Sequence, residues 1–263
     1  MSDVLVNHEA GGVLTLTFNR PERLNALDEE LTRALIDALG DARERNAVRC
    51  VVLAGMGRGF SAGQDLRAYA AGKKRDESFS VREYLRRGNN VIATRLRALE
   101  KPVIALINGA AAGAGLSIAL ACDVRIASED ARFTLGFSKI GLIPDGGASY
   151  LLPLVVGLGR AFELAYTSES IDAHEALRIG LVNRVVPAAE LGNAVCAFTA
   201  TLLERPSRGL ALTKRAFNRT MMSGFEEWLE AEADLQEHAS QSEDHHEALT
   251  AFVEKRSPKF TGH

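Results

Sequence analysis

The sequence predicts an α/β fold in which short buried strands alternate with helices. Apolar, often β-branched runs bounded by glycine or proline recur along the first part of the chain, as expected for strands buried on both faces. Segments with helical spacing of leucine and alanine separate these runs, and this alternation is typical of α/β proteins rather than β-sandwiches. After about Ala189 the strand pattern ends and only helical patterns follow.

The first elements have clear sequence signals. Residues 13–18 alternate apolar and polar side chains before a proline, which predicts a strand. Leucines at helical spacing from Leu27 to Leu39 predict a helix with Asp28 as its N-cap. Residues 48–57, "VRCVVLAGMG", predict a buried strand. A polar segment at 70–80 precedes a predicted helix over 81–99.

The middle of the chain repeats a strand–turn–helix–strand order. "PVIALIN" predicts a strand, "GAAAGAG" a turn, "LSIALAC" a helix and "DVRIAS" another strand. The remaining segments, 191–204, 207–222 and 225–255, predict helices only. We therefore expect a core over residues 1–200 and a C-terminal helical region over 201–263, used for assembly or for closing a site.

Composition excludes several classes of protein. The net charge is -3, and lysine and arginine are scattered, so no basic stripe predicts nucleic-acid binding. The three cysteines are widely spaced and lie among apolar residues, which argues against disulfides and zinc sites and predicts buried thiols in a reducing compartment. The first residues resemble no signal peptide, and no apolar run reaches about 18 residues. We expect a cytoplasmic protein that does not enter a membrane.

Two glycine-rich turns carry the strongest functional signal. "FSAGQDL" (60–66) and "NGAAAGAGLSIALACD" (108–123) follow strand-like runs, and the second opens a helix. Small residues leave backbone N–H groups accessible, and two such turns facing each other can hold one oxyanion. The structural alternative is that the small residues only permit close packing of helix on strand. Neither turn is a Walker A motif or a GxGxxG fingerprint.

Several motifs together resemble one known family. "RPERLNALD", "FSAGQDL", "KPVIALINGAAAGAGLSIALACDVRIAS", "KIGLIPDGGASYLLPLVVG" and "EALRIGLVNRVVP" occur in the order and spacing of the enoyl-CoA hydratase/isomerase (crotonase) superfamily. The resemblance implies a spiral of repeated ββα units with a C-terminal helical trimerisation region, assembling as a homotrimer or a dimer of trimers. It also implies an acyl-CoA substrate, no separate cofactor and no metal.

The resemblance also implies a set of site residues. The backbone N–H groups of Gln64 and Ala114 would bind the thioester oxygen. CoA would run past residues 23–26 and 61–66, with a basic or aromatic contribution from the C-terminal tail, and the acyl pocket would involve residues 73–90. The substrate-binding positions are Arg23, Ala26, Ser61, Ala62, Gly63, Asp65, Leu66, Gly113, Ser117, Phe137 and Tyr150.

The two glutamates that hydratases of this family use fall on Ser117 and Phe137. Neither side chain can activate water as a carboxylate would, which argues against hydration. Asp145 in "GLIPDGG", by contrast, resembles the catalytic aspartate of the phenylacetate-pathway ring-epoxide isomerases and related enoyl-CoA isomerases. It would both remove and return a proton, and its apolar neighbours would raise its basicity. The structural alternative makes Asp145 the N-cap of the helix that follows.

Other interpretations stay open. Hydration would require Asp145, with or without Ser117, to activate water, and a non-catalytic acyl-CoA-binding protein would keep only the turns. A dehalogenase is disfavoured because Phe137 and Asn90 stand where that relative has tryptophan and histidine. We also expect Ser117 to bond back to its own helix, Asp65 and Asp123 to brace turns, His245 and His246 to be solvated, and Tyr150 and Asn90 to line the acyl pocket.

Overall fold

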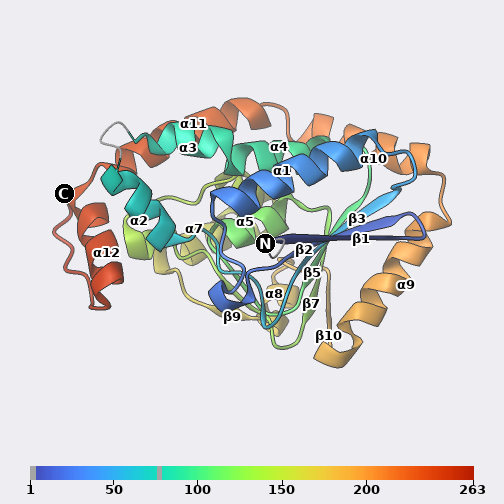
Figure 1. Ribbon diagram of the computed structural model, residues 1–263, viewed down its shortest axis with the longest axis horizontal. Helices are drawn as coiled ribbons and strands as arrows, with labels where there is room; N and C mark the ends of the chain where they lie inside the picture. Colours follow the sequence, from blue (N-terminus) through green and yellow to red (C-terminus); the bar gives the residue numbers. More distant parts are fainter. Residues whose placement is uncertain (1–3, 76–78) are drawn as a thin grey trace.

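A six-stranded sheet forms the centre of the computed structural model, which describes residues 4–75 and 79–263. Its strand order is β1-β2-β3-β5-β7-β10, and all neighbours pair parallel except the hairpin β1–β2 (Figure 1). The strands are β1 (Leu5–Ala10), β2 (Val13–Phe18), β3 (Cys50–Gly55), β5 (Val103–Ile107), β7 (Val124–Ser128) and β10 (Arg184–Val186).

A smaller sheet of order β4-β6-β8-β9 lies beside the first. β4 directly follows β3, β6 follows β5 and β8 follows β7, and each such pair of strands is followed by a helix. This succession confirms the predicted ββα repeat. The strands are β4 (Gly59–Ser61), β6 (Ala110–Ala112), β8 (Arg132–Thr134) and β9 (Ile171–Asp172).

The helices follow the sequence pattern with one clear departure. Asp28 caps the first helix by accepting from the Leu31 N–H at 2.9 Å, as predicted. The helix expected over 81–99 is instead two helices that meet at Gly88. Glycine lowers helix propensity, and the break directs Asn89 and Asn90 into the protein. The helices up to this region are α1 (Glu29–Glu44), α2 (Leu66–Arg75), α3 (Val81–Arg87) and α4 (Asn89–Ala98).

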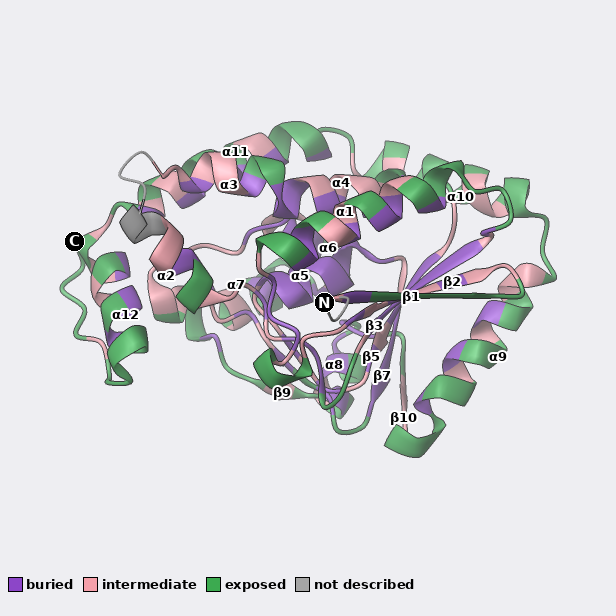
Figure 2. Ribbon diagram, viewed as in Figure 1, coloured by how far each residue is buried: buried purple, intermediate pink, exposed green. Residues whose placement is uncertain are grey.

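Helices cover both faces of the large sheet. The main core joins it to α1, α4, α5 (Ala114–Ala121) and α6 (Ala148–Val156), and α9 (Leu191–Leu203) packs a second core on the opposite face. Figure 2 shows α5 buried throughout, whereas α6 is buried on one side only. Cys50 and Cys122 are buried as predicted, but Cys196 is exposed because it lies on the outer side of α9. Two further helices, α7 (Leu158–Thr167) and α8 (Ala173–Arg178), precede β10.

The C-terminal helices lie against the core. They are α10 (Ser207–Met221), α11 (Phe225–Ser240) and α12 (Glu243–Glu254). Of these, α11 and α12 contain buried residues and α10 contains none. The predicted boundary at residue 200 falls inside α9. Because α9 packs on the large sheet, the separate helical region begins with α10. α11 lies along α3, and α12 contacts α2 (Figure 1). Within the described ranges, no helix is long and apolar enough to span a membrane.

Candidate active site

The two glycine-rich turns meet, which is the arrangement that the family resemblance implies. Gly63 has φ +85°, and a Cβ there would lie 2.6 Å from the Ala112 carbonyl oxygen and 3.0 Å from the Ala114 nitrogen. Gly113, with φ +49°, comes directly before α5. Both positions require glycine because of the positive φ, and at Gly63 also because of the close backbone approach. The end of one turn therefore lies against the start of α5.

Each turn presents one backbone N–H group. Ala114 is the first residue of α5, so its N–H has no acceptor within the helix. On the other turn, the Gly63 carbonyl accepts from the Leu27 N–H at 2.7 Å, and the Asp65 N–H donates to the Leu27 carbonyl at 2.9 Å. Successive residues of an extended segment point their N–H groups to opposite sides, so the Gln64 N–H points away from Leu27. Two N–H groups on touching turns are the arrangement that an oxyanion hole requires.

Side chains around the first turn brace it. The Ser61 hydroxyl donates to the Asn25 carbonyl at 2.8 Å and accepts from the Gly63 N–H. Asp65 pairs with Arg20 at 3.1 Å and accepts from the Ala68 N–H, which caps α2. The Gln64 side-chain amide donates to the Leu27 carbonyl and, at 2.5 Å, to the Tyr84 hydroxyl. The bracing role predicted for Asp65 is confirmed, and Ser61 shares it.

The turn before α6 carries Asp145, and the helix-capping interpretation of this residue is wrong. The α6 N-cap is Gly147, and the Asp145 side chain does not cap the helix. The Glu232 carboxylate of α11 accepts from the Gly147 N–H at 2.8 Å and from the Ser149 N–H at 3.3 Å instead. Gly146 and Gly147 both have positive φ, so the chain reverses and the Asp145 carboxyl is buried.

Asp145 lies in a setting that makes its carboxylate basic. The residue is 7% exposed, and its Oδ2 accepts from the Gln236 side-chain amide at 3.1 Å. Burial raises the pKa of Asp145 to about 7, although hydrogen bonding from Gln236 and Asn89 opposes the rise. Its Oδ1 accepts no hydrogen bond of normal geometry from the described groups, although the Asn89 side chain lies close enough to favour the ionised carboxyl. The carboxyl can therefore accept or donate a proton near neutral pH.

The Asp145 turn packs on the first turn of α5, next to the N–H donors. A Cβ at Gly146 would lie 3.3 Å from the Ser117 Cβ and 3.5 Å from the Asn89 Cβ. Ser117 is itself one helical turn after Gly113, and its hydroxyl donates to the Gly113 carbonyl at 3.3 Å. The predicted back-bonding of Ser117 is confirmed. A buried basic carboxylate and an oxyanion-type turn thus border the same end of α5.

Comparison with known proteins agrees with the family resemblance seen in the sequence. The family model described as enoyl-CoA hydratase/isomerase matches residues 8–263. The chain belongs to the enoyl-CoA hydratase/isomerase family. It is 40% identical to the 1,2-epoxyphenylacetyl-CoA isomerase of Escherichia coli over 100% of both chains. It is 37% identical to the short-chain-enoyl-CoA hydratase of Clostridium acetobutylicum, covering 97% of this chain and 96% of the relative.

Solved structures extend the comparison to the fold. A crystal structure of an enoyl-CoA hydratase from Mycobacterium avium subsp. paratuberculosis superposes with a TM-score of 0.88 at 39% identity, covering 98% of each chain. A monofunctional enoyl CoA isomerase from M. smegmatis superposes with a TM-score of 0.70 at 38% identity, covering 85% of this chain and 94% of that one. The chain therefore resembles solved structures of both hydratases and isomerases.

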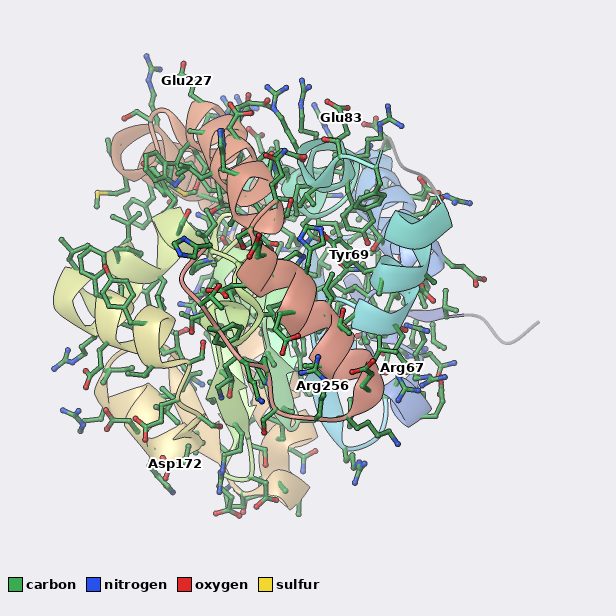
Figure 3. The ribbon with its side chains drawn as sticks, turned by 90° about the vertical axis from the view of Figure 1, so that its left-hand side faces the viewer. Arg67, Tyr69, Glu83, Asp172, Glu227 and Arg256 are labelled. Atoms are coloured by element: carbon green, nitrogen blue, oxygen red, sulfur yellow. The ribbon has the colours of Figure 1, made fainter. Side chains whose placement is uncertain are left out.

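The sequence analysis did not predict two groups of site residues. Glu232 and Gln236 come from α11, in the region expected to serve assembly or to close a site, and Tyr69 and Tyr84 come from α2 and α3. The α11 pair carries a weak signal, because the two polar residues share the helical spacing of the buried Leu229 and Ala233. Figure 3 shows Tyr69 between α2 and α12. Burial is the largest cause of the raised pKa of Tyr84, about 12, and also raises that of Tyr69.

Several predicted positions lie away from Asp145. The Tyr150 hydroxyl donates to the Met221 carbonyl at 3.1 Å, so this ring faces the α10–α11 connection. The Asn90 side chain donates to the Leu229 carbonyl, and its neighbour Asn89 approaches Asp145 instead. Their predicted place in the acyl pocket is not supported by these contacts, because each side chain is engaged with the C-terminal helices.

His245 is not solvated, so the expectation for this residue was wrong. His245 is fully buried, with its Nδ1 2.6 Å from the Ile140 carbonyl oxygen, because the inner side of α12 packs on the loop before Asp145. His246 is exposed, as predicted. Asp123 braces the fold as expected, with Arg97 and Lys214 as ion-pair partners.

The remaining predicted positions surround the two turns. Phe137 is buried in the short helix η2 (Phe137–Ile140), so the place of the second hydratase glutamate is apolar. Arg23 is exposed at the end of η1 (Pro21–Arg23) and Ala26 is buried beside it. Ala62 donates its N–H to the Leu24 carbonyl at 2.8 Å, and Leu66 starts α2. In the described part of the chain, no cluster of three His, Cys, Asp or Glu side chains could hold a metal ion.

Proposed function

We propose that the chain is an acyl-CoA isomerase that moves a carbon–carbon double bond by proton transfer. Asp145 is the base and then the acid, and the N–H groups of Gln64 and Ala114 stabilise the intermediate. The observation that carries the proposal is the buried Asp145 carboxylate, which lies at the same end of α5 as the oxyanion turn and whose pKa burial raises to about 7. Ser117 and Phe137 supply no second carboxylate at the positions where hydratases of this family use glutamates.

The proposed reaction needs only the residues of this site. The ionised Asp145 removes a proton from the carbon next to the thioester of a 3-enoyl-CoA. The electron pair moves to the thioester oxygen, and the enolate charge is held by the two N–H donors, which typically contributes several kcal/mol. Asp145 then returns the proton to the far carbon of the former double bond. The product is the isomeric 2-enoyl-CoA, with no water added and no cofactor required.

Turnover in deuterated water distinguishes this proposal from its alternatives. A 3-enoyl-CoA and, separately, its 2-enoyl isomer are incubated with the protein, and the products are separated by chromatography and analysed by mass spectrometry. Conversion of the 3-enoyl-CoA to the 2-enoyl-CoA without added water supports isomerisation, and gain of one heavy water by the 2-enoyl-CoA supports hydration, the activity named for the Clostridium relative. Binding of the thioester without turnover, on aliphatic and aromatic acyl-CoA panels alike, would support a non-catalytic acyl-CoA-binding protein.

Replacing Asp145 tests its role directly. Asp145→Asn keeps the size of the side chain but cannot accept a proton, so isomerisation should fall by at least about 100-fold. The oxyanion turn is unchanged, so acyl-CoA affinity, measured by calorimetry, should change little. Full isomerase turnover by this variant would show that another group moves the proton.

A further inference from the structure

The inner face of α11 carries two buried polar side chains, one helical turn apart, that point at the turn bearing Asp145. Glu232 is 1% exposed and Gln236 is fully buried. Polar groups this deeply buried are retained only where they are hydrogen-bonded. Their partners therefore indicate what they do.

Gln236 holds the turn with every hydrogen-bonding atom of its amide. Its Oε1 accepts from the Ile143 N–H at 2.8 Å, and its Nε2 donates to the Ile143 carbonyl at 3.0 Å and to Asp145 Oδ2 at 3.1 Å. The primary amide has two N–H hydrogens, and both are used. Gln236 thereby fixes the backbone before Asp145 and one oxygen of its carboxylate.

Glu232 holds the other end of the same turn. It accepts from the backbone N–H groups of Gly147 and Ser149, and the Ser149 hydroxyl also donates to it. The Trp228 indole N–H in turn donates to that hydroxyl at 2.9 Å. Because these contacts lie at the N-terminus of α6, a carboxylate there is favoured by the helix dipole. α11 thus forms hydrogen bonds with residues on both sides of Asp145.

We propose that Gln236 is a positioning residue for the proton transfer: it binds Asp145 Oδ2 and leaves Oδ1 to carry the proton. The inference rests on the proposed role of Asp145. It assigns α11, a helix of the C-terminal region, to the active site of its own chain. Glu232 is the second support, since it fixes where α6 begins.

Gln236 also affects the charge of Asp145. A donor to a carboxylate stabilises the ionised form and lowers its pKa, so Gln236 opposes the effect of burial. Titratable groups that interact electrostatically with Asp145 include Glu232 on α11, Tyr69 on α2 and Tyr84 on α3. These three supply no positive charge, and the buried His245 of α12 faces the loop before Asp145. The side-chain amides of Gln236 and Asn89 are the groups that favour the ionised carboxylate.

Two variants and a control test the inference. Gln236→Met keeps the volume but removes the donor, and Gln236→Glu keeps the shape while placing a second acid beside Asp145. We expect the acid limb of the kcat–pH profile to move to higher pH by about one unit in Gln236→Met and further in Gln236→Glu. KM should change less than threefold. Gln241→Met, the same replacement at the exposed end of α11, should leave the profile unchanged.

A measurement without turnover separates this inference from the proposed function. The ¹³C carboxyl signal of Asp145, identified by its loss in Asp145→Asn, is titrated in wild type and Gln236→Met. A higher pKa in a folded Gln236→Met supports the positioning role even if no isomerase activity is found. An unchanged pKa together with an unchanged pH profile would overturn it, whatever reaction Asp145 performs. Should Gln236→Met fail to fold, the titration is made with Gln236→Glu, in which an Asp145 pKa no higher than in wild type would overturn the inference.

Discussion

A buried aspartate with a pKa near 7 has consequences for both activity and stability. Only the ionised form can remove a proton, so isomerisation should increase with pH and level off above about 7. The ordinary pKa of aspartate, 3.8, applies to the unfolded chain. The folded protein therefore binds the Asp145 proton more tightly than the unfolded chain does. Folding is favoured most when the carboxyl is protonated, and this contribution is lost as pH rises from about 4 to 7.

Replacing the charge should therefore stabilise the protein while abolishing its activity. At pH 8 we expect Asp145→Asn to raise the free energy of unfolding by about 2 to 4 kcal/mol, because the variant buries no carboxylate charge. At pH 3, where both forms are neutral, the two proteins should differ by less than about 1 kcal/mol. Urea unfolding at the two pH values measures this difference. A variant less stable than wild type at pH 8 would contradict the raised pKa.

Glu232 contributes to the same comparison. Burial also raises its pKa to about 7, against hydrogen bonds from the Ser149 side chain and the backbone of Gly147 and Ser149, and the charge of Asp145 raises it further. Its effect on stability has the same sign in both proteins and is smaller in Asp145→Asn, which lacks that charge. Wild type should accordingly lose stability between pH 5 and 8 by more than Asp145→Asn does.

At the scale of elements, the glycine turns show what the sequence could predict. The residue pattern of "GAAAGAG" indicated accessible N–H groups, and the contact of Gly63 with the start of α5 confirms that the turns face each other. The break at Gly88 was missed because glycine occurs within helices as well as between them. The roles of Glu232 and Gln236 were missed because they depend on the packing of a helix about 90 residues beyond Asp145, which local patterns do not specify.

The approach of α5 to β4 gives an element-scale prediction. A Cβ at Gly115 would lie 2.6 Å from the Ser61 carbonyl oxygen and 2.7 Å from the Ser61 Cβ. Gly115→Ala should push α5 away from β4, displacing the Ala114 N–H and lowering the free energy of unfolding by about 1 to 3 kcal/mol. The ratio kcat/KM should fall by at least about tenfold, because both oxyanion donors must reach one oxygen.

A second glycine provides the matched control. Gly209 lies on α10 with nothing within 4 Å of a Cβ placed there. Gly209→Ala should raise stability by about 0.5 to 1 kcal/mol through helix propensity and leave kcat/KM unchanged. Thermal melts and steady-state kinetics of both variants test the two predictions. Equal kinetics for Gly115→Ala and wild type would show that the exact position of α5 does not matter for catalysis.

At the scale of the whole molecule, the C-terminal region has two roles. α10 is tied to the core by Lys214, whose ammonium pairs with Asp123 at 2.8 Å and donates to the Leu96 carbonyl at 2.8 Å. α11 carries the residues that hold the Asp145 turn. The outer side of the same region, however, exposes large apolar side chains. We infer that one side of these helices completes the site of its own chain and the other side joins a second chain.

Two apolar faces on one chain favour a ring-shaped assembly. Leu158, Phe162 and Tyr166 are exposed on α7, and Leu212, Phe217 and Met221 are exposed on α10. The two helices lie apart in Figure 1. Exposed groups of large apolar side chains mark contact surfaces, and two different faces that meet in successive copies close into a ring. We propose that the assembly is the trimer that the resemblance to the family implies.

Phe217 provides the test of this assembly. Its side chain is 65% exposed, and burying a phenylalanine contributes about 1.5 to 3 kcal/mol, here once in each interface of the ring. Phe217→Asp removes this contribution and places a charge in each interface, so sedimentation velocity at micromolar concentration should show monomers in place of trimers. Ala200→Asp, exposed on α9, should remain trimeric. Because α11 holds Asp145 within one chain, the Asp145 carboxyl in monomeric Phe217→Asp should still titrate near pH 7, whereas a pKa returned to about 4 would show that the site is completed only by assembly.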